Sequence, residues 1–233
     1  MKMPELDGII DRRILINYRV DPLIVSTLLP PHLEPLVVNG FASVGICLLR
    51  LKNIGIKHAP GFMRVNSENA AHRFLVKFRD NGQPAVFIPR RDTDSLLNIV
   101  IGNRLLSWPH FPAHFISTER NGSYAVAMRS EDEYSRLDIE AELATEFPGN
   151  SMFDSLEHAS NCFNACQVGV SPSTKPGEYK TVKLHTKTWN VQTLRVNKLQ
   201  SSFFEDRKKF PGHTISFDNA LLMEGIEHEW LFS

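Results

Sequence analysis

The sequence predicts a mainly β protein with a few helices, an α+β fold in which an antiparallel sheet closes into a β-barrel. Three observations predict it: hairpin signals recur along the chain, helical patterns are confined to short segments, and no long linker divides the chain. A sheet built from hairpins must close or cover its edges, because open edges pair with other chains. A barrel with helices across one mouth meets this requirement. We therefore expect a single domain over residues 1–233.

The composition is that of an ordinary globular protein, with 42% hydrophobic and 22% charged residues. Lys+Arg and Asp+Glu number 26 each, which argues against nucleic-acid or membrane-surface binding through bulk charge. No apolar run approaches the length of a membrane span. The three cysteines fit a reduced, cytoplasmic protein better than a disulfide scaffold. We expect a cytoplasmic protein with neither nucleic acid nor membrane as partner.

The first elements follow from a β-branched run and a capping signal. Residues 14–20 are rich in β-branched and aromatic side chains and are typical of a strand. Asp21 can cap a short helix with Pro22 at its first position, where a missing N–H costs nothing. That helix is expected to reach Leu29 and to stop at Pro30.

Hairpins are predicted at three polar turns. Asn39 and Gly40 carry the strongest signal, because both residues tolerate the positive φ that a two-residue hairpin turn requires. Residues 80–83 and 120–123 contain Asn-Gly pairs of the same kind. The strands that these turns join are expected over residues 33–38, 41–51, 71–79, 85–88, 115–118 and 124–129.

The remaining segments are predicted from periodicity and composition. Loops are expected over residues 52–68 and 171–177, which contain glycine and proline. Helices are expected over residues 96–106, 156–163 and 217–222. Further strands are expected over residues 139–145, 182–191, 193–196 and 226–232.

Three blocks of sequence, in this order along the chain, resemble the acetoacetate decarboxylase superfamily, and more closely an uncharacterised branch of it. The first covers residues 17–21 and leads into residues 29–34; the second covers residues 102–111; the third is residues 182–185 followed by Trp189. The resemblance implies an antiparallel β-barrel of the acetoacetate decarboxylase-like type, with a small-molecule pocket beside the second block. It also implies a homo-oligomer.

The second block departs from the pattern of the decarboxylases. Those enzymes form a Schiff base on a lysine whose pKa a neighbouring lysine lowers. The two lysine positions correspond to His110 and Phe111 in this sequence, and the family's Arg-Glu pair corresponds to Asn103 and Arg104. An imidazole cannot form a stable imine. The resemblance therefore implies the fold and the position of the pocket, and not decarboxylation through an imine.

Three residues are the catalytic candidates: His110, Glu68 and Arg104. His110 can act as a general acid or base, or hold a carboxylate when protonated; the alternative is a structural histidine with one hydrogen bond. Arg104 can clamp a carboxylate through two hydrogen bonds. Glu68, a possible counterpart of a family glutamate, can serve as a second acid/base or as the structural partner of an arginine.

The substrate-binding candidates surround the same segment. Trp108 and Phe111 are expected as apolar walls, and Arg73 as a further carboxylate ligand or as a surface arginine with a packed stem. His114 follows His110 at a spacing that metal ligands use on a helix, but an intervening proline disfavours a helix there. We expect no metal site.

His185 and Trp189 lie on one face of a predicted strand, where they can wall the pocket or simply belong to the core. Phosphate-binding glycine loops and the Gly-x-Ser-x-Gly nucleophile motif are absent from the sequence, so no cofactor is expected.

These observations lead to one leading hypothesis and two rivals. The leading hypothesis is a barrel pocket for a small organic acid or carbonyl compound, with lyase- or isomerase-like general acid/base chemistry at His110. The first rival is a non-catalytic binding or structural barrel. The second retains imine chemistry on another lysine, Lys77 or Lys187, both on predicted strands.

Overall fold

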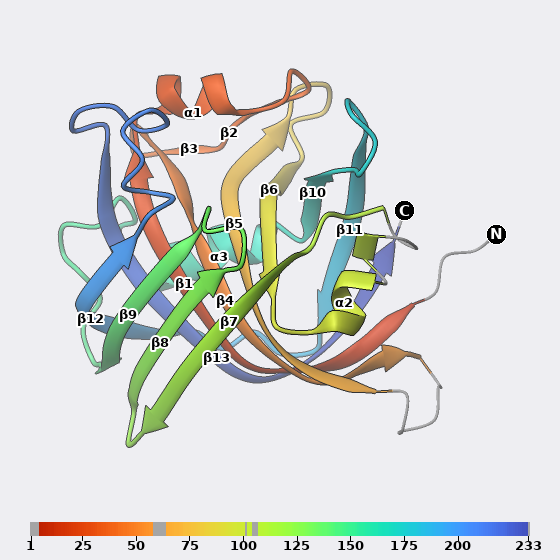
Figure 1. Ribbon diagram of the computed structural model, residues 1–233. Helices are drawn as coiled ribbons and strands as arrows, with labels where there is room; N and C mark the ends of the chain where they lie inside the picture. Colours follow the sequence, from red (N-terminus) through yellow and green to blue (C-terminus); the bar gives the residue numbers. More distant parts are fainter. Residues whose placement is uncertain (1–4, 58–63, 101, 104–106, 233) are drawn as a thin grey trace.

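The computed structural model describes residues 5–57, 64–100, 102–103 and 107–232, and its strands form one 13-stranded sheet (Figure 1). The strands of the first half are β1 (Leu6–Val20), β2 (Leu33–Pro35), β3 (Val37–Val38), β4 (Phe41–Ile56), β5 (Val65–Phe78), β6 (Pro84–Thr93) and β7 (Phe111–Arg120). Those of the second half are β8 (Ser123–Ser130), β9 (Arg136–Ala144), β10 (Val168–Pro172), β11 (Tyr179–Thr186), β12 (Gln192–Ser201) and β13 (Ile215–Phe232). The helices are α1 (Pro22–Leu28), α2 (Leu96–Val100) and α3 (Leu156–Ala165).

The sheet closes on itself, so the predicted β-barrel is confirmed. Going round the ring, β13 pairs with β1, then β4, β5, β6, β7, β8, β9 and β12, which returns to β13. A second connection runs from β6 through β10 and β11 to the other end of β13. The pairings are antiparallel except those of β6 with β7 and with β10, which are parallel.

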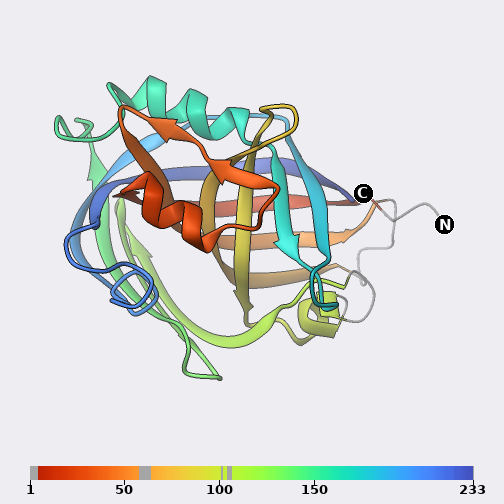
Figure 2. The ribbon, with the colours of Figure 1, turned by 90° about the horizontal axis from the view of Figure 1, so that it is seen from above.

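The two connections lie on opposite faces of the strands that they share. On one face, residues such as Ile14 and Ile46 pack against β7, β8, β9 and β12 and form the main core. On the other face, Leu15, Cys47 and Leu75 pack against α3. This follows from the alternation of side chains along a strand. Seen from above, α3 and β7 lie on opposite sides of the molecule (Figure 2).

The helix cap and two of the hairpin turns predicted from the sequence are confirmed. The Asp21 carboxylate accepts a hydrogen bond from the backbone N–H of Leu23 at 2.8 Å and caps α1. Asn39 and Gly40 have φ of 47° and 84°, as the predicted hairpin turn requires. The hairpin between β7 and β8 turns at Asn121 and Gly122 in the same way.

Two loop predictions were wrong in their extent, because pairing with neighbouring strands continues into these segments. The loop expected over residues 52–68 is shorter, because β4 continues to Ile56 along β1 and β5 begins at Val65. The loop expected over residues 171–177 begins within β10, which pairs with β6 and β11.

The helix predictions had different outcomes. The helix expected over residues 96–106 is confirmed where the structure describes it: α2 covers Leu96–Val100, residues 102–103 are helical as well, and residues 101 and 104–106 lie outside the described residues. The helix expected over residues 217–222 lies inside β13. Residues 220–223 are 0% exposed, so both faces of β13 are buried there and the strand shows no polar alternation. Among the described residues, no helix is long and apolar enough to cross a membrane.

Buried histidines predict that acid destabilises the fold. Burial lowers the pKa of His72 to about 3 and that of His228 to about 4, both from 6.5. Between the ordinary pKa of 6.5 and these lowered pKa values, the two histidines bind more protons in the unfolded chain than in the folded protein, so stability falls as pH falls. Burial raises the pKa of Asp92 from 3.8 to about 6, which works in the opposite sense and offsets part of the loss.

We therefore expect the free energy of unfolding from urea titrations to fall between about pH 6.5 and about pH 4. His72→Phe keeps a ring against Phe203, whose centroid lies 4.2 Å away, and removes one titrating group. The variant should show a shallower pH dependence than the wild type. A wild-type free energy that stays constant over this range would contradict the assignment.

Candidate functional site

A cavity of about 530 Å³ lies between the shared sheet and α3, β10 and β11. Its floor comes from β1, β4, β5 and β6, and most of its wall is apolar. The apolar lining includes Ile10, Leu49, Leu51, Ile54, Val65, Ile88, Val182, Leu184 and Trp230. The polar lining includes Arg13, Arg73, Arg91, His110, Asn69, Asn98 and Gln167. A few polar groups in a mostly apolar cavity are typical of small-molecule sites.

His110 reaches the cavity from the segment that precedes β7, and Asn103 fixes its backbone. The Asn103 side-chain oxygen accepts a hydrogen bond from the His110 N–H at 2.7 Å, and its amide nitrogen donates to the His110 carbonyl at 3.2 Å. The backbone N–H of Trp108 donates to the Gly102 carbonyl at 2.8 Å and closes the turn. The sequence had singled out Asn103 only as a departure from the family pattern.

The tautomer of His110 follows from its contact with the backbone. Its Nδ1 lies 3.1 Å from the Trp108 carbonyl oxygen, which can only accept a hydrogen bond. Nδ1 therefore carries the proton and Nε2 is left as an acceptor. Burial and the nearby positive charge of Arg91 lower the pKa of His110 to about 4. At neutral pH, His110 is therefore an uncharged imidazole.

Arg91 is the cation beside this imidazole. Its guanidinium donates a hydrogen bond to the Ser171 hydroxyl at 2.6 Å and lies 4.7 Å from the centre of the Trp108 ring. Burial lowers the pKa of Arg91 to about 10, so the group stays charged at neutral pH. Trp108 thus packs against the arginine and lines the cavity.

Arg73 and Arg13 occupy the floor of the cavity. Arg73 is 3% exposed; it donates to the Asn17 side-chain oxygen, and its guanidinium lies 4.7 Å from the centre of the Phe163 ring. Arg13 donates from Nε to the Cys47 sulfur at 3.3 Å. No carboxylate among the described residues forms an ion pair with Arg13, Arg73 or Arg91.

Glu68 occupies a different place, in an ion-pair network outside the residues that line the cavity. Its carboxylate accepts hydrogen bonds from Arg12 at 2.6 Å and from Arg50 at 2.8 Å. Arg12 is 1% exposed and also pairs with Glu119 at 2.5 Å. The geometry is that of the structural partner considered for Glu68 from the sequence.

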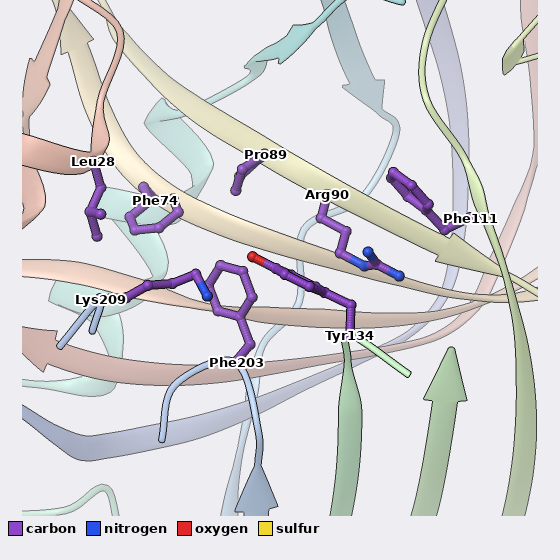
Figure 3. Close-up of a pocket in the computed structure, with 8 residues that line it drawn as sticks. All are labelled: Leu28, Phe74, Pro89, Arg90, Phe111, Tyr134, Phe203 and Lys209. Atoms are coloured by element: carbon purple, nitrogen blue, oxygen red, sulfur yellow. The ribbon is translucent and has the colours of Figure 1, made fainter. Parts of the chain in front are cut away.

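Phe111 lines a second, separate pocket of about 390 Å³, shown in Figure 3. The guanidinium of Arg90 lies 4.1 Å from its ring centre. The charge of Arg90 is neutralised by Asp92 at 2.7 Å and Asp132 at 2.8 Å. The other cation of this pocket, Lys209, pairs with Asp206. The pocket therefore offers aromatic walls but no unpaired charge among the described residues.

The other predicted contacts do not line the large cavity. His114 is exposed on β7 and lies 3.7 Å from Glu131. His185 is exposed on β11 opposite Glu229. Trp189 packs on the α3 side of the sheet, where its Nε1–H donates to the Ser160 hydroxyl at 3.0 Å and its ring contacts Arg13. Arg104 lies outside the described residues.

Sequence reasoning missed Arg13 and Arg91. Both stand within apolar strands, Arg13 in the run from Ile10 to Ile16 and Arg91 shortly after Ile88. A charged side chain inside such a strand is the signal that could have found them, because it must either find a partner or face a cavity. The sequence alone does not distinguish Arg13 from its neighbour Arg12, which is paired.

In the described part of the chain, no group of three or more His, Cys, Asp or Glu side chains is placed to hold a metal ion.

The thiol of Cys166 lies near Arg73 and is not activated by it. Burial raises the pKa of Cys166 to about 12, so this thiol stays protonated at neutral pH despite the nearby guanidinium.

Comparison with known proteins places the chain in a family. Residues 10–220 match the family of uncharacterized conserved proteins called DUF2071. The chain belongs to this family. Among curated proteins, no sequence match was found.

Solved structures show the same fold at low sequence identity. Acetoacetate decarboxylase from Legionella pneumophila subsp. pneumophila str. Philadelphia 1 superposes with a TM-score of 0.65 at 12% identity, over 99% of this chain and 85% of that one. The enduracididine biosynthesis enzyme MppR, complexed with pyruvate, gives 0.64 at 13% identity, over 99% and 89%. An acetoacetate decarboxylase-like enzyme from Sphingomonas wittichii RW1 gives 0.54 at 11% identity, over 100% and 90%. This DUF2071 member therefore has the acetoacetate decarboxylase-like fold.

Gly102 is predicted to be required for the position of His110. A Cβ added at Gly102 would lie 2.1 Å from the His110 Nδ1. That ring cannot retreat without breaking its hydrogen bond to the Trp108 carbonyl. We expect Gly102→Ala to destabilise the protein by about 1–3 kcal/mol through overpacking. The two-dimensional NMR signals of the His110 ring should also shift. An unchanged ring environment would contradict the contact.

Glu68 is predicted to act on stability. Glu68→Gln removes one of two carboxylates from the buried Arg12, so we expect a loss of up to about 3 kcal/mol, measured by urea unfolding. Ligand affinity at the cavity should remain unchanged in the folded variant. If Glu68 instead serves as an acid/base at the cavity, the substitution should alter ligand affinity or turnover.

Proposed function

We propose that this protein binds a small organic acid in the large cavity, with the ligand's carboxylate on Arg91 and its reacting carbon beside His110. One observation carries the proposal: Arg91 presents a guanidinium without a carboxylate partner to a mostly apolar cavity, next to a neutral imidazole. A buried charge without a partner is costly, and an anionic ligand would compensate it.

The contacts of Arg91 prepare it for such a ligand. The Ser171 hydroxyl and the Trp108 ring hold the guanidinium in place and leave its charge unneutralised. Guanidinium groups bind carboxylates through paired, parallel hydrogen bonds. The surrounding apolar wall would contact the hydrocarbon part of an organic ligand. It would also exclude water and so strengthen the ion pair.

His110 supplies the candidate acid/base group. Without ligand, burial and Arg91 hold its pKa at about 4, which makes it a weak base. A carboxylate on Arg91 would cancel the positive field, so the pKa of His110 should rise toward its ordinary value of 6.5. A base is most effective near the working pH. Ligand binding would thereby activate His110 for proton transfer, as a lyase- or isomerase-like reaction requires.

An imine mechanism has less support. His110 stands where the decarboxylases resembled by this sequence carry a lysine. No lysine lines the described part of the cavity. Lys77 is half-buried and pairs with Glu34 at 3.0 Å, and Lys187 is exposed and pairs with Glu227. The hydrogen bond to Glu227 raises the pKa of Lys187, and a protonated lysine is a poor nucleophile. Lys77 is not among the residues that line the cavity.

The structural neighbours agree with a small acid as ligand. MppR was solved with pyruvate, a keto acid, although its 13% identity to this chain establishes the fold alone. The alternative function is a barrel that binds such a ligand without catalysis. It is favoured by one observation: among the described residues, the His110 imidazole hydrogen-bonds only to the Trp108 carbonyl.

The test is a thermal-shift panel of keto, hydroxy and simple carboxylic acids. A ligand at about 100 times its Kd should stabilise the wild type by about 2.7 kcal/mol. Arg91→Met should lose this shift, whereas the same change at Arg195, which pairs with Glu142 on the surface, should retain it. A panel in which no acid stabilises the wild type, or an Arg91→Met variant that binds normally, would overturn the proposal.

The role of His110 is measured separately on the acid that binds. The His110→Gln variant should keep binding and lose any turnover. The pKa of His110, followed by NMR, should rise from about 4 when the acid is added. A ligand-bound His110 with an unchanged pKa would favour the non-catalytic alternative.

A further inference from the structure

Arg13 and Arg73 form a second group of charges in the same cavity, and the proposed carboxylate on Arg91 does not account for them. Arg73 stands on β5 and Arg13 on β1, with β4 between them. Both guanidiniums gather around Cys47, which lines the floor between them. The Arg13 Nη1 and the Arg73 Nε are buried and have no hydrogen-bond partner within the described part of the chain.

The rest of the molecule shows that this arrangement is unusual for this chain. Arg12, Arg50 and Arg90 are also buried or half-buried, and each pairs with two or more carboxylates. At the floor of the cavity the neighbours are neutral instead: a thiol, an amide oxygen and two aromatic rings. These contacts orient the guanidiniums without neutralising them.

The charges at the floor also repel each other. Burial, together with the positive charge of Arg13, lowers the pKa of Arg73 to about 10, so Arg73 remains cationic at neutral pH. The one carboxylate in the lining, Asp92, is held by Arg90 at 2.7 Å. A ligand with a single carboxylate would therefore compensate Arg91 and leave the floor uncompensated.

We propose that the ligand of this cavity is a dicarboxylic acid, with one carboxylate on Arg91 beside His110 and the other on Arg13 and Arg73. The assignment rests on the proposed function, because it names the class of organic acid that the same cavity takes. Arg13 and Arg73 approach the second carboxylate from different strands, and this geometry selects ligands with an anionic group at each end.

The experiment compares each dicarboxylate with its monoamide, which has nearly the same shape and one charge fewer. Succinate, glutarate and adipate and their monoamides are titrated calorimetrically into the wild type and into Arg73→Met and Arg91→Met. At least one dicarboxylate should bind the wild type 10-fold or more tighter than its monoamide. In Arg73→Met this preference should fall to about 2-fold or less while the monoamide keeps its affinity. Arg91→Met should weaken both ligands.

A structural effect of the substitution is separated by two further measurements. Methionine retains an unbranched apolar stem and removes a buried charge that has no carboxylate partner, which offsets the lost hydrogen bond to Asn17, so unliganded Arg73→Met should melt no lower than the wild type. Arg13→Met repeats the test from the other strand if Arg73→Met does not fold. 3-Phosphonopropionate is titrated as well, and tighter binding than that of succinate, which has the same two-methylene spacer, would overturn a carboxylate as the second group.

The outcomes distinguish the two proposals. Equal binding of every dicarboxylate and its monoamide, both lost in Arg91→Met, would overturn the second subsite and leave the organic-acid function standing. No binding of any of these acids to the wild type, together with a negative panel of monoacids, would overturn the proposed function itself.

Discussion

Side chains alternate between two faces along β1, β4, β5 and β6, and both the core and the cavity depend on this alternation. Because the sheet is closed twice, both faces are covered over much of their length: one packs against β7, β8, β9 and β12, and the other faces α3, β10 and β11. Neighbouring residues of one strand consequently enter different environments. In β1, Ile14 belongs to the main core, whereas Arg13 enters the cavity.

The arginines show what this partition means for electrostatics. Arg90 and Arg91 are adjacent in β6 and point to opposite faces. Arg90 meets Asp92 and Asp132 and contributes to the structure through paired charges. Arg91 meets a hydroxyl and an indole ring, which orient it but leave its charge available. A charge that the fold does not neutralise lowers stability, and binding of an anion would recover that cost.

The position of His110 depends on a different constraint, the backbone of the segment before β7. Asn103 hydrogen-bonds both the backbone N–H and the carbonyl of His110, and Gly102 leaves room for the His110 ring. The Trp108 carbonyl fixes the tautomer of that ring. These contacts are local in sequence, and they hold the imidazole at a cavity whose floor comes from distant strands. The site is thus assembled from a histidine held by local contacts and from several long strands.

The sequence by itself determined the fold class, the hairpin turns and the cap of α1, because positive φ at Asn39 and Gly40 and the Asp21 cap depend on local backbone chemistry. It also identified His110, Trp108 and Arg73, which the tertiary structure brings to one cavity. Only the tertiary structure decided which arginines are neutralised, placed Phe111 in a separate pocket and set Glu68 among Arg12 and Arg50. Partners of this kind lie on strands far apart in the chain, and their pairing depends on register and closure.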